Sequence, residues 1–103
     1  MNQFGFPQDF VIDLQTKLRN FKQEFAMEFQ KRVEDRTPVL TGALKAGWVT
    51  EQTVTGFTLN NVQPYAEYVE NGTDKMAPRA MVATTVLEID QMVDLVAKKV
   101  GLK

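Results

Sequence analysis

Three acidic side chains in the second half of the sequence, Glu67, Glu70 and Asp74, lie close enough along the chain to suggest chemistry. Neighbouring carboxylates can act as an acid and a base, or they can bind a divalent ion such as Mg²⁺ or Ca²⁺. However, no nucleophile or histidine accompanies them, and the spacing of Glu70 and Asp74 matches no calcium-binding loop. We therefore predict no catalytic or metal site here, and keep a metal-dependent enzyme built on Glu67 and Glu70 as an alternative.

The rest of the chain offers few other groups for catalysis. Its 103 residues include no cysteine and no histidine, which excludes thiol chemistry, cysteine-based zinc sites and the commonest general base. A second acidic pair, Glu24 and Glu28, lies one helical turn apart, and Arg32 follows one turn later. This spacing is typical of a solvent-exposed helix face. We accordingly expect a protein that is not an enzyme and that uses no cofactor or metal.

A long helix is the first element that positions these residues. Apolar residues recur every three or four positions between residues 8 and 36, which predicts one helix with a single apolar face. Thr37-Pro38 ends it, because a residue before proline is pushed out of the helical region. Since such a helix would be about 40 Å long, we expect part of its face to contact another subunit. The residues of this face are Val11, Leu14, Leu18, Phe21, Phe25, Phe29 and Val33.

Residues 37–77 are predicted to form a turn, a strand pair and a short helical segment. Thr41 can cap a single helical turn, and Gly42 lets the backbone turn tightly. β-Branched and aromatic residues predict strands at about 47–54 and 57–62, joined at Thr55-Gly56. The side chains expected to face the core are Trp48, Val54, Phe57 and Leu59.

One or two helical turns are expected between Pro64 and Glu70, because Tyr65, Tyr68 and Val69 follow helical spacing. Asn71-Gly72 then reverses the chain. We expect Gly72 to have a positive φ that asparagine could also adopt with little strain.

A single C-terminal helix is predicted for residues 78–100. Its apolar residues are spaced four and three apart, the rhythm of a helix packed along another helix. They are Val82, Val86, Ile89, Val93, Val96 and Val100. We expect Glu88, Asp90 and Asp94 to make the outer face acidic, and the methionines to fill gaps in the core. The predicted fold class is α+β, a single domain over 1–103: a long N-terminal helix, a small antiparallel β-sheet and a C-terminal helix packed against the first.

Two groups of basic residues on the first helix raise the alternative of a small nucleic-acid-associated regulatory protein. They are Lys17, Arg19 and Lys22, and then Lys31, Arg32 and Arg36. Because acids interrupt both groups and the net charge is −1, a solvated helix face is the favoured interpretation. No apolar run approaches the length of a membrane span, and the N-terminus lacks the pattern of a signal peptide. We therefore expect a soluble protein made in the cytoplasm.

Two stretches, "RTPVLTGALKAGW" and "PYAEYVENGTDKMAPRAMV", resemble a known family. Their content and order are similar to the head–tail connector and tail-completion proteins of tailed bacteriophages. In that family a long helix ends in a "TPVDTGxL"-like turn, and a "YAxYVExGT" segment precedes a "PARPF"-like start of the last helix. The candidate interface consists of residues in these motifs and in an N-terminal arm, residues 1–7: Phe4, Phe6, Thr37, Pro38, Thr41, Gly42, Leu44, Tyr65, Tyr68, Glu70, Gly72, Thr73, Pro78 and Arg79.

The resemblance implies a non-enzymatic structural protein of the virion neck, assembled in the host cytoplasm. It implies a homo-oligomeric ring, six-fold or twelve-fold, between the portal side of the head and the tail. Its neighbours would be an adjacent head–tail connector or portal-side protein and a tail terminator or tail tube protein. DNA would pass through the channel without sequence-specific binding, and no membrane would be involved.

Overall fold

The computed structural model describes residues 5–39, 42–74 and 77–103, and it confirms the predicted α+β class. A long N-terminal helix, a two-stranded antiparallel sheet and C-terminal helices that contact the first helix are all present. In chain order the elements are α1 (Gln8–Asp35), α2 (Ala43–Ala46), β1 (Trp48–Gln52), β2 (Phe57–Asn61), α3 (Ala66–Asn71), α4 (Met81–Val86) and α5 (Ile89–Val100).

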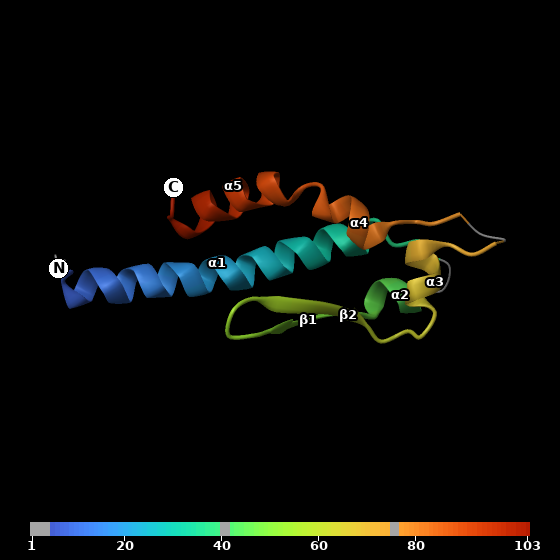
Figure 1. Cartoon of the computed structure of the whole chain (residues 1–103), viewed down its shortest axis with the longest axis horizontal. Helices are drawn as coiled ribbons and strands as arrows, with labels where there is room; N and C mark the ends of the chain where they lie inside the picture. Colours follow the sequence, from blue (N-terminus) through green and yellow to red (C-terminus); the bar gives the residue numbers. More distant parts are fainter. Residues whose placement is uncertain (1–4, 40–41, 75–76) are drawn as a thin grey trace, which may run out of the picture.

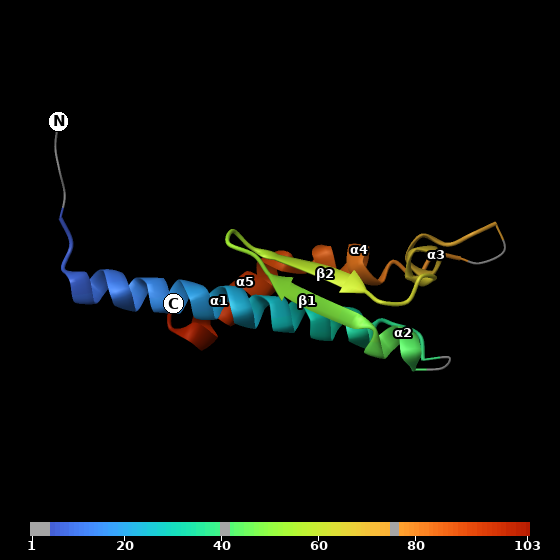
Figure 2. The same cartoon turned by 90° about the horizontal axis from the view of Figure 1, so that it is seen from below.

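Helix α1 is the axis of the molecule. Helices α4 and α5 run along one side of it and the β-hairpin along the other, while α2 and α3 lie at its C-terminal end (Figure 1). The hairpin pairs Trp48 with Asn61 and Gln52 with Phe57. The molecule is elongated, with principal extents of 62 × 28 × 21 Å, and α1 accounts for most of its length (Figure 2).

The hydrophobic core lies against the C-terminal half of α1. Its buried apolar side chains are Ala26, Phe29, Val33, Leu44, Trp48, Met81, Met92, Val96 and Ala97. The expectation that methionines fill the core is confirmed for Met81 and Met92 and is wrong for Met27, which is exposed. Met1 and Met76 lie outside the described residues. Phe57 of the hairpin adds ring contacts, with its centroid 6.1 Å from that of Phe25 and 6.0 Å from that of Phe29.

The apolar face predicted for α1 is therefore buried only in part. Phe29 and Val33 are buried, whereas Leu14 and Leu18 are exposed. The physical reason is length: α5 runs antiparallel to α1, and its C-terminal Gly101 lies beside Lys17. The helix N-terminal to Lys17 extends past both α5 and the hairpin (Figure 1).

The prediction of one C-terminal helix over 78–100 is wrong. The helix begins at Met81, after Ala80 adopts a left-handed conformation with φ 47° and ψ 44°, and it breaks between α4 and α5. At the break the N–H groups of Leu87 and Glu88 donate to the carbonyls of Thr84 and Thr85, the tighter three-residue spacing of a helix end.

The predicted apolar face of this region is confirmed only in part. Val96 is buried and Val82 packs against the core, whereas Val86, Ile89 and Val93 are exposed. The other side chains directed at α1 lie about one position earlier along the chain than predicted and include two charged ones, which bind partners on α1: Met81, Thr85, Glu88, Met92 and Lys99.

In the hairpin, the core-facing positions are confirmed for Trp48, Phe57 and Leu59, which pack in or against the core. Val54 was predicted to join them, but it is 98% exposed. It lies in the turn, where Thr53 donates its N–H to the carbonyl of Gly56, so its side chain has no sheet face to pack on.

Candidate assembly site

The two motifs meet in space at the C-terminal end of α1. The first motif ends α1 and forms α2, and the second forms α3 and the start of α4. Leu44 of the first motif and Met81 of the second pack in the same core cluster. Within the motifs, some side chains hold this junction together and others lie on its surface.

Thr37 holds the end of α1 to the hairpin. Its hydroxyl donates to the carbonyl of Val33, one turn back, at 2.7 Å, and accepts the indole N–H of Trp48 at 2.8 Å. Both Thr37 and Trp48 are buried, so this hydroxyl satisfies a donor that water cannot reach. Pro38, which follows, is half-buried where α1 ends.

The short helix α2 depends on a backbone turn and on an asparagine. Gly42 has φ 81°, a left-handed conformation that glycine adopts at little cost. Leu44 is buried in the core, and its carbonyl accepts a hydrogen bond from the side chain of Asn61 at 2.8 Å. Thr41, the predicted cap of this turn, lies outside the described residues.

Glu70 links α3 to α4. Its carboxylate accepts the N–H of Val82 at 2.9 Å with one oxygen and that of Ala83 at 3.0 Å with the other. These N–H groups belong to the first turn of α4, where a helix has unsatisfied donors and favours negative charge. Glu70 is therefore a helix cap placed in the sequence eleven residues before the helix that it caps.

The segment leading into α4 is also bound to α3. The N–H of Arg79 donates to the carbonyl of Val69 at 2.9 Å, and that of Ala80 donates to the carbonyl of Glu70 at 3.1 Å. The chain can return to α3 because Gly72 has φ 76° and ψ 176°. The predicted positive φ is confirmed, but this region is essentially restricted to glycine, so the expectation that asparagine fits there is corrected.

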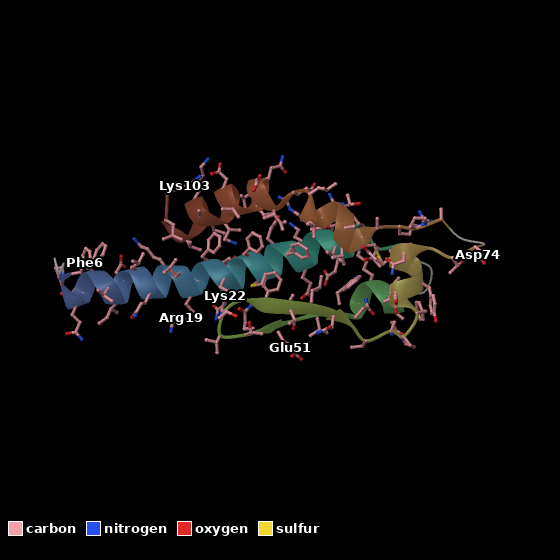
Figure 3. All side chains as sticks on the ribbon, in the orientation of Figure 1. Phe6, Arg19, Lys22, Glu51, Asp74 and Lys103 are labelled. Carbon is pink, nitrogen blue, oxygen red and sulfur yellow. The ribbon has the colours of Figure 1, made fainter. Side chains whose placement is uncertain are left out.

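Other motif side chains lie on the surface of this junction. They are Tyr65, Tyr68, Thr73, Pro78 and Arg79, all exposed. Tyrosine and arginine are typical of protein interfaces, so Tyr65, Tyr68 and Arg79 are the candidate contacts with a partner. At the opposite end of the molecule, Phe6 is 66% exposed (Figure 3), and Phe4 lies outside the described residues.

A cluster of charges between α1 and the α4–α5 break was not predicted. Glu88 binds Arg36 at 2.7 Å and Arg32 at 3.2 Å, and Arg32 also binds Glu28 at 2.9 Å. Arg36 donates a further hydrogen bond to the buried hydroxyl of Thr85 at 2.7 Å. The expected solvent-exposed face at Glu28 and Arg32 is thus an inter-helix contact, and Glu88 points at α1 rather than outward.

The two arginines change the acidity of Glu88. The hydrogen bond from Arg36 is the largest cause and holds the pKa of Glu88 below its usual value, against the opposite effect of partial burial. Sequence spacing gives little sign of this cluster, because Glu88 is more than fifty residues from its partners.

The basic groups on α1 are largely engaged by the chain itself. Lys17 pairs with Asp13 at 3.2 Å, and Lys22 donates to the carbonyl of Thr53 in the hairpin turn. Arg19 points away from the body of the molecule (Figure 3). Arg32 and Arg36 belong to the cluster around Glu88, so no continuous basic stripe runs along the described part of α1.

The acidic residues that suggested chemistry differ in their surroundings. The carboxylate of Glu70 is directed to the backbone of α4, whereas Glu67 is exposed on α3. Within the described ranges, no group of three or more acidic side chains is placed to hold a metal ion. Nor does any helix in these ranges have the length and apolar content needed to cross a membrane.

Comparison with protein-family models, with curated proteins and with solved structures finds no match to this chain. The resemblance to the phage neck proteins therefore depends on the two motifs alone.

Proposed function

We propose that the chain is a non-enzymatic structural protein of the neck of a tailed bacteriophage, where copies of it form a ring that joins the portal side of the head to the tail. The observation that carries this proposal is the junction of the two motifs, in which Thr37, Gly42 and Glu70 build the turn, the short helix and the helix cap. Each of these family positions has a physical task in one compact unit.

The large surface of the chain supports an assembled state. Its accessible surface is 7553 Å², about a quarter more than the ~5,900 Å² of a compact monomer of this mass. Its radius of gyration is 17.8 Å, against about 13 Å for a compact domain of 100 residues. The excess area is of the size that two contacts of about 800 Å² on each subunit would cover, as each member of a ring has two neighbours.

The distribution of charge supports a channel that DNA traverses without being held. The chain has a net charge of −1, and Arg32 and Arg36 are neutralised by carboxylates of the same chain. Binding to DNA depends on unneutralised basic side chains that displace counterions. The same charges disfavour the alternative of a nucleic-acid-associated regulator.

Electron microscopy of the purified protein and of phage particles tests the proposal. We expect closed rings, six-fold or twelve-fold, and density for this chain between the portal and the tail. In isolation at low concentration the protein can be mostly monomeric, because the ring is then completed only on a portal or tail template. Absence of the chain from purified particles would refute the proposal, as would salt-sensitive binding to DNA at physiological ionic strength.

A further inference from the structure

The described part of the chain leaves uncovered an aromatic pair at the N-terminal end of α1. Phe6 is 66% exposed and Phe10 is 53% exposed, and their rings stack with centroids 5.8 Å apart. Both precede Lys17, where α5 ends, so neither α5 nor the hairpin reaches them. Phe10 lies in the first turn of α1 and Phe6 lies just before the helix. Exposed aromatic side chains are typical of protein interfaces.

A groove between α1 and α5 offers a complementary surface. It has a volume of about 290 Å³, and its apolar lining includes Met27 and Leu95, which are 62% and 48% exposed. An apolar cavity of about 150 Å³ is already large enough to hold a benzene ring. Methionine adapts its shape to an aromatic neighbour and makes favourable sulfur–ring contacts. The groove therefore suits an aromatic side chain.

The charges beside these two surfaces have opposite signs. At the groove, Glu24 is paired with Lys99 and Glu28 with Arg32, so Lys31 is the remaining charge of the lining, with no ion pair to any described residue.

Beside the aromatic pair, Asp13 is paired with Lys17, while Asp9 has no ion pair within the described ranges. Among the described residues, one surface thus has a negative side chain without an ion pair and the other a positive one. Such an arrangement favours and orients their contact.

We propose that Phe6 and Phe10 of one copy dock into the Met27–Leu95 groove of the next copy, with Asp9 facing Lys31. The partner is thus a second copy of this chain. The contact joins two different surfaces, so it repeats head-to-tail, and it closes into a ring when the rotation per subunit divides a full turn. The inference rests on the proposed ring and names the surfaces that meet in it.

The contact cannot form within one chain. Phe10 and Met27 lie on the same straight helix, about 25 Å apart at 1.5 Å per residue. Asp9 and Lys31 lie farther apart still on that helix. A disulfide requires Cα atoms within about 7 Å. Because the chain has no cysteine, introduced cysteines report this contact without background.

The test is oxidation of the double variant Asp9→Cys with Lys31→Cys at high protein concentration, which leaves the aromatic pair and the apolar lining of the groove intact. We expect a ladder of covalently linked oligomers on a non-reducing gel. The matched control pairs Asp9→Cys with Leu87→Cys, since Leu87 is 84% exposed but lies outside the groove. The control should give no ladder. A mixture of the two single variants Asp9→Cys and Lys31→Cys should stop at the dimer.

Two results would overturn the proposal. One is a double variant that stays monomeric while its circular dichroism and urea melt match those of the unsubstituted protein. The other is a dimer formed by Asp9→Cys alone, which would mean that two aromatic pairs meet symmetrically. In the cysteine-free protein, Asp9→Lys should weaken self-association about two- to fivefold in sedimentation experiments, and adding Lys31→Asp should restore it. Failure of the second change to restore self-association would refute the charge pairing.

The cross-linking experiment tests the contact between copies, and the analysis of phage particles tests the neck location separately. If the protein forms the ladder but is absent from phage particles, the neck location is refuted and the contact between copies is kept. A protein found in the neck that gives no ladder would keep the location and refute the contact.

Discussion

Replacement of Glu70 by alanine should destabilise the chain through the loss of the α4 cap. The carboxylate accepts the half-buried N–H of Val82 and the exposed N–H of Ala83. After truncation, water can reach the second donor but only partly the first, so the loss exceeds that of a solvated bond. Loss of a side-chain cap costs about 0.5–2 kcal/mol, and loss of a negative charge at a helix N-terminus costs about 0.3–1 kcal/mol. We expect Glu70→Ala to lower the free energy of unfolding by about 1–2 kcal/mol in all.

The assay is urea unfolding followed by circular dichroism, with thermal melts in parallel. For a domain of this size, 1 kcal/mol shifts the Tm by about 4–8 °C. Glu70→Gln keeps one acceptor oxygen and should lose roughly half as much. The matched control is Glu67→Ala, three residues earlier on the same helix, where the side chain is exposed and the change should stay within about 0.5 kcal/mol.

The two alanine variants decide the argument. If Glu70→Ala and Glu67→Ala unfold at the same urea concentration, the carboxylate does not cap α4. Amide exchange gives an independent check, because the N–H groups of Val82 and Ala83 should exchange faster in Glu70→Ala, while those of the hairpin stay unchanged.

The other predictions concern the buried threonine, two glycines and the charged cluster. Thr37→Val should destabilise by about 1–3 kcal/mol by leaving the buried Trp48 indole N–H without a partner, whereas Thr37→Ser should cost less; equal urea melts would contradict this. Gly42→Asn should be nearly neutral because asparagine tolerates left-handed turns, but Gly72→Asn should cost about 1–3 kcal/mol; equal costs would contradict the assigned ψ angles. The lowered pKa of Glu88 means that its contribution to stability is present above its unfolded pKa of about 4.5 and is lost as the pH falls through its folded pKa; Glu88→Gln should flatten that part of the stability–pH profile, and an unchanged profile would refute the role of the cluster.

Local signals were sufficient for much of the fold. The apolar period and Thr37-Pro38 predicted α1 to within one residue of its observed end, Asp35. β-Branched and aromatic residues predicted the hairpin, and Asn71-Gly72 predicted the reversal after α3. Each of these features depends on neighbours in the sequence, which is why a single chain reveals them.

The C-terminal helices show where such signals fail. Glu88 and Lys99 face α1 because each finds an opposite charge there. When the sequence is searched for an apolar helix face, these charged positions are omitted, and Val86 and Val93 are chosen although they are exposed. The break between α4 and α5 also has no local signal, since no glycine or proline marks it.

The motif positions could be predicted, but their separate tasks could not. Thr37 and Glu70 were candidate interface residues, yet Thr37 is buried and Glu70 is occupied by backbone donors. Tyr65 and Tyr68, from the same motif, are exposed. A sequence motif combines positions needed for folding with positions needed for contact, and only the geometry separates them.

The length of α1 connects the two kinds of position. The helix has 28 residues and so spans about 42 Å, with the exposed tyrosines beyond its C-terminal end and the aromatic pair at its N-terminal end. A continuous helix transmits orientation over that distance better than a loop would. In the proposed ring, a lateral contact at the aromatic pair would therefore fix the direction in which the motif junction faces. The caps and hydrogen bonds that hold this junction rigid would then serve assembly without touching a neighbour, which explains why residues such as Glu70 can belong to an assembly motif while pointing inward.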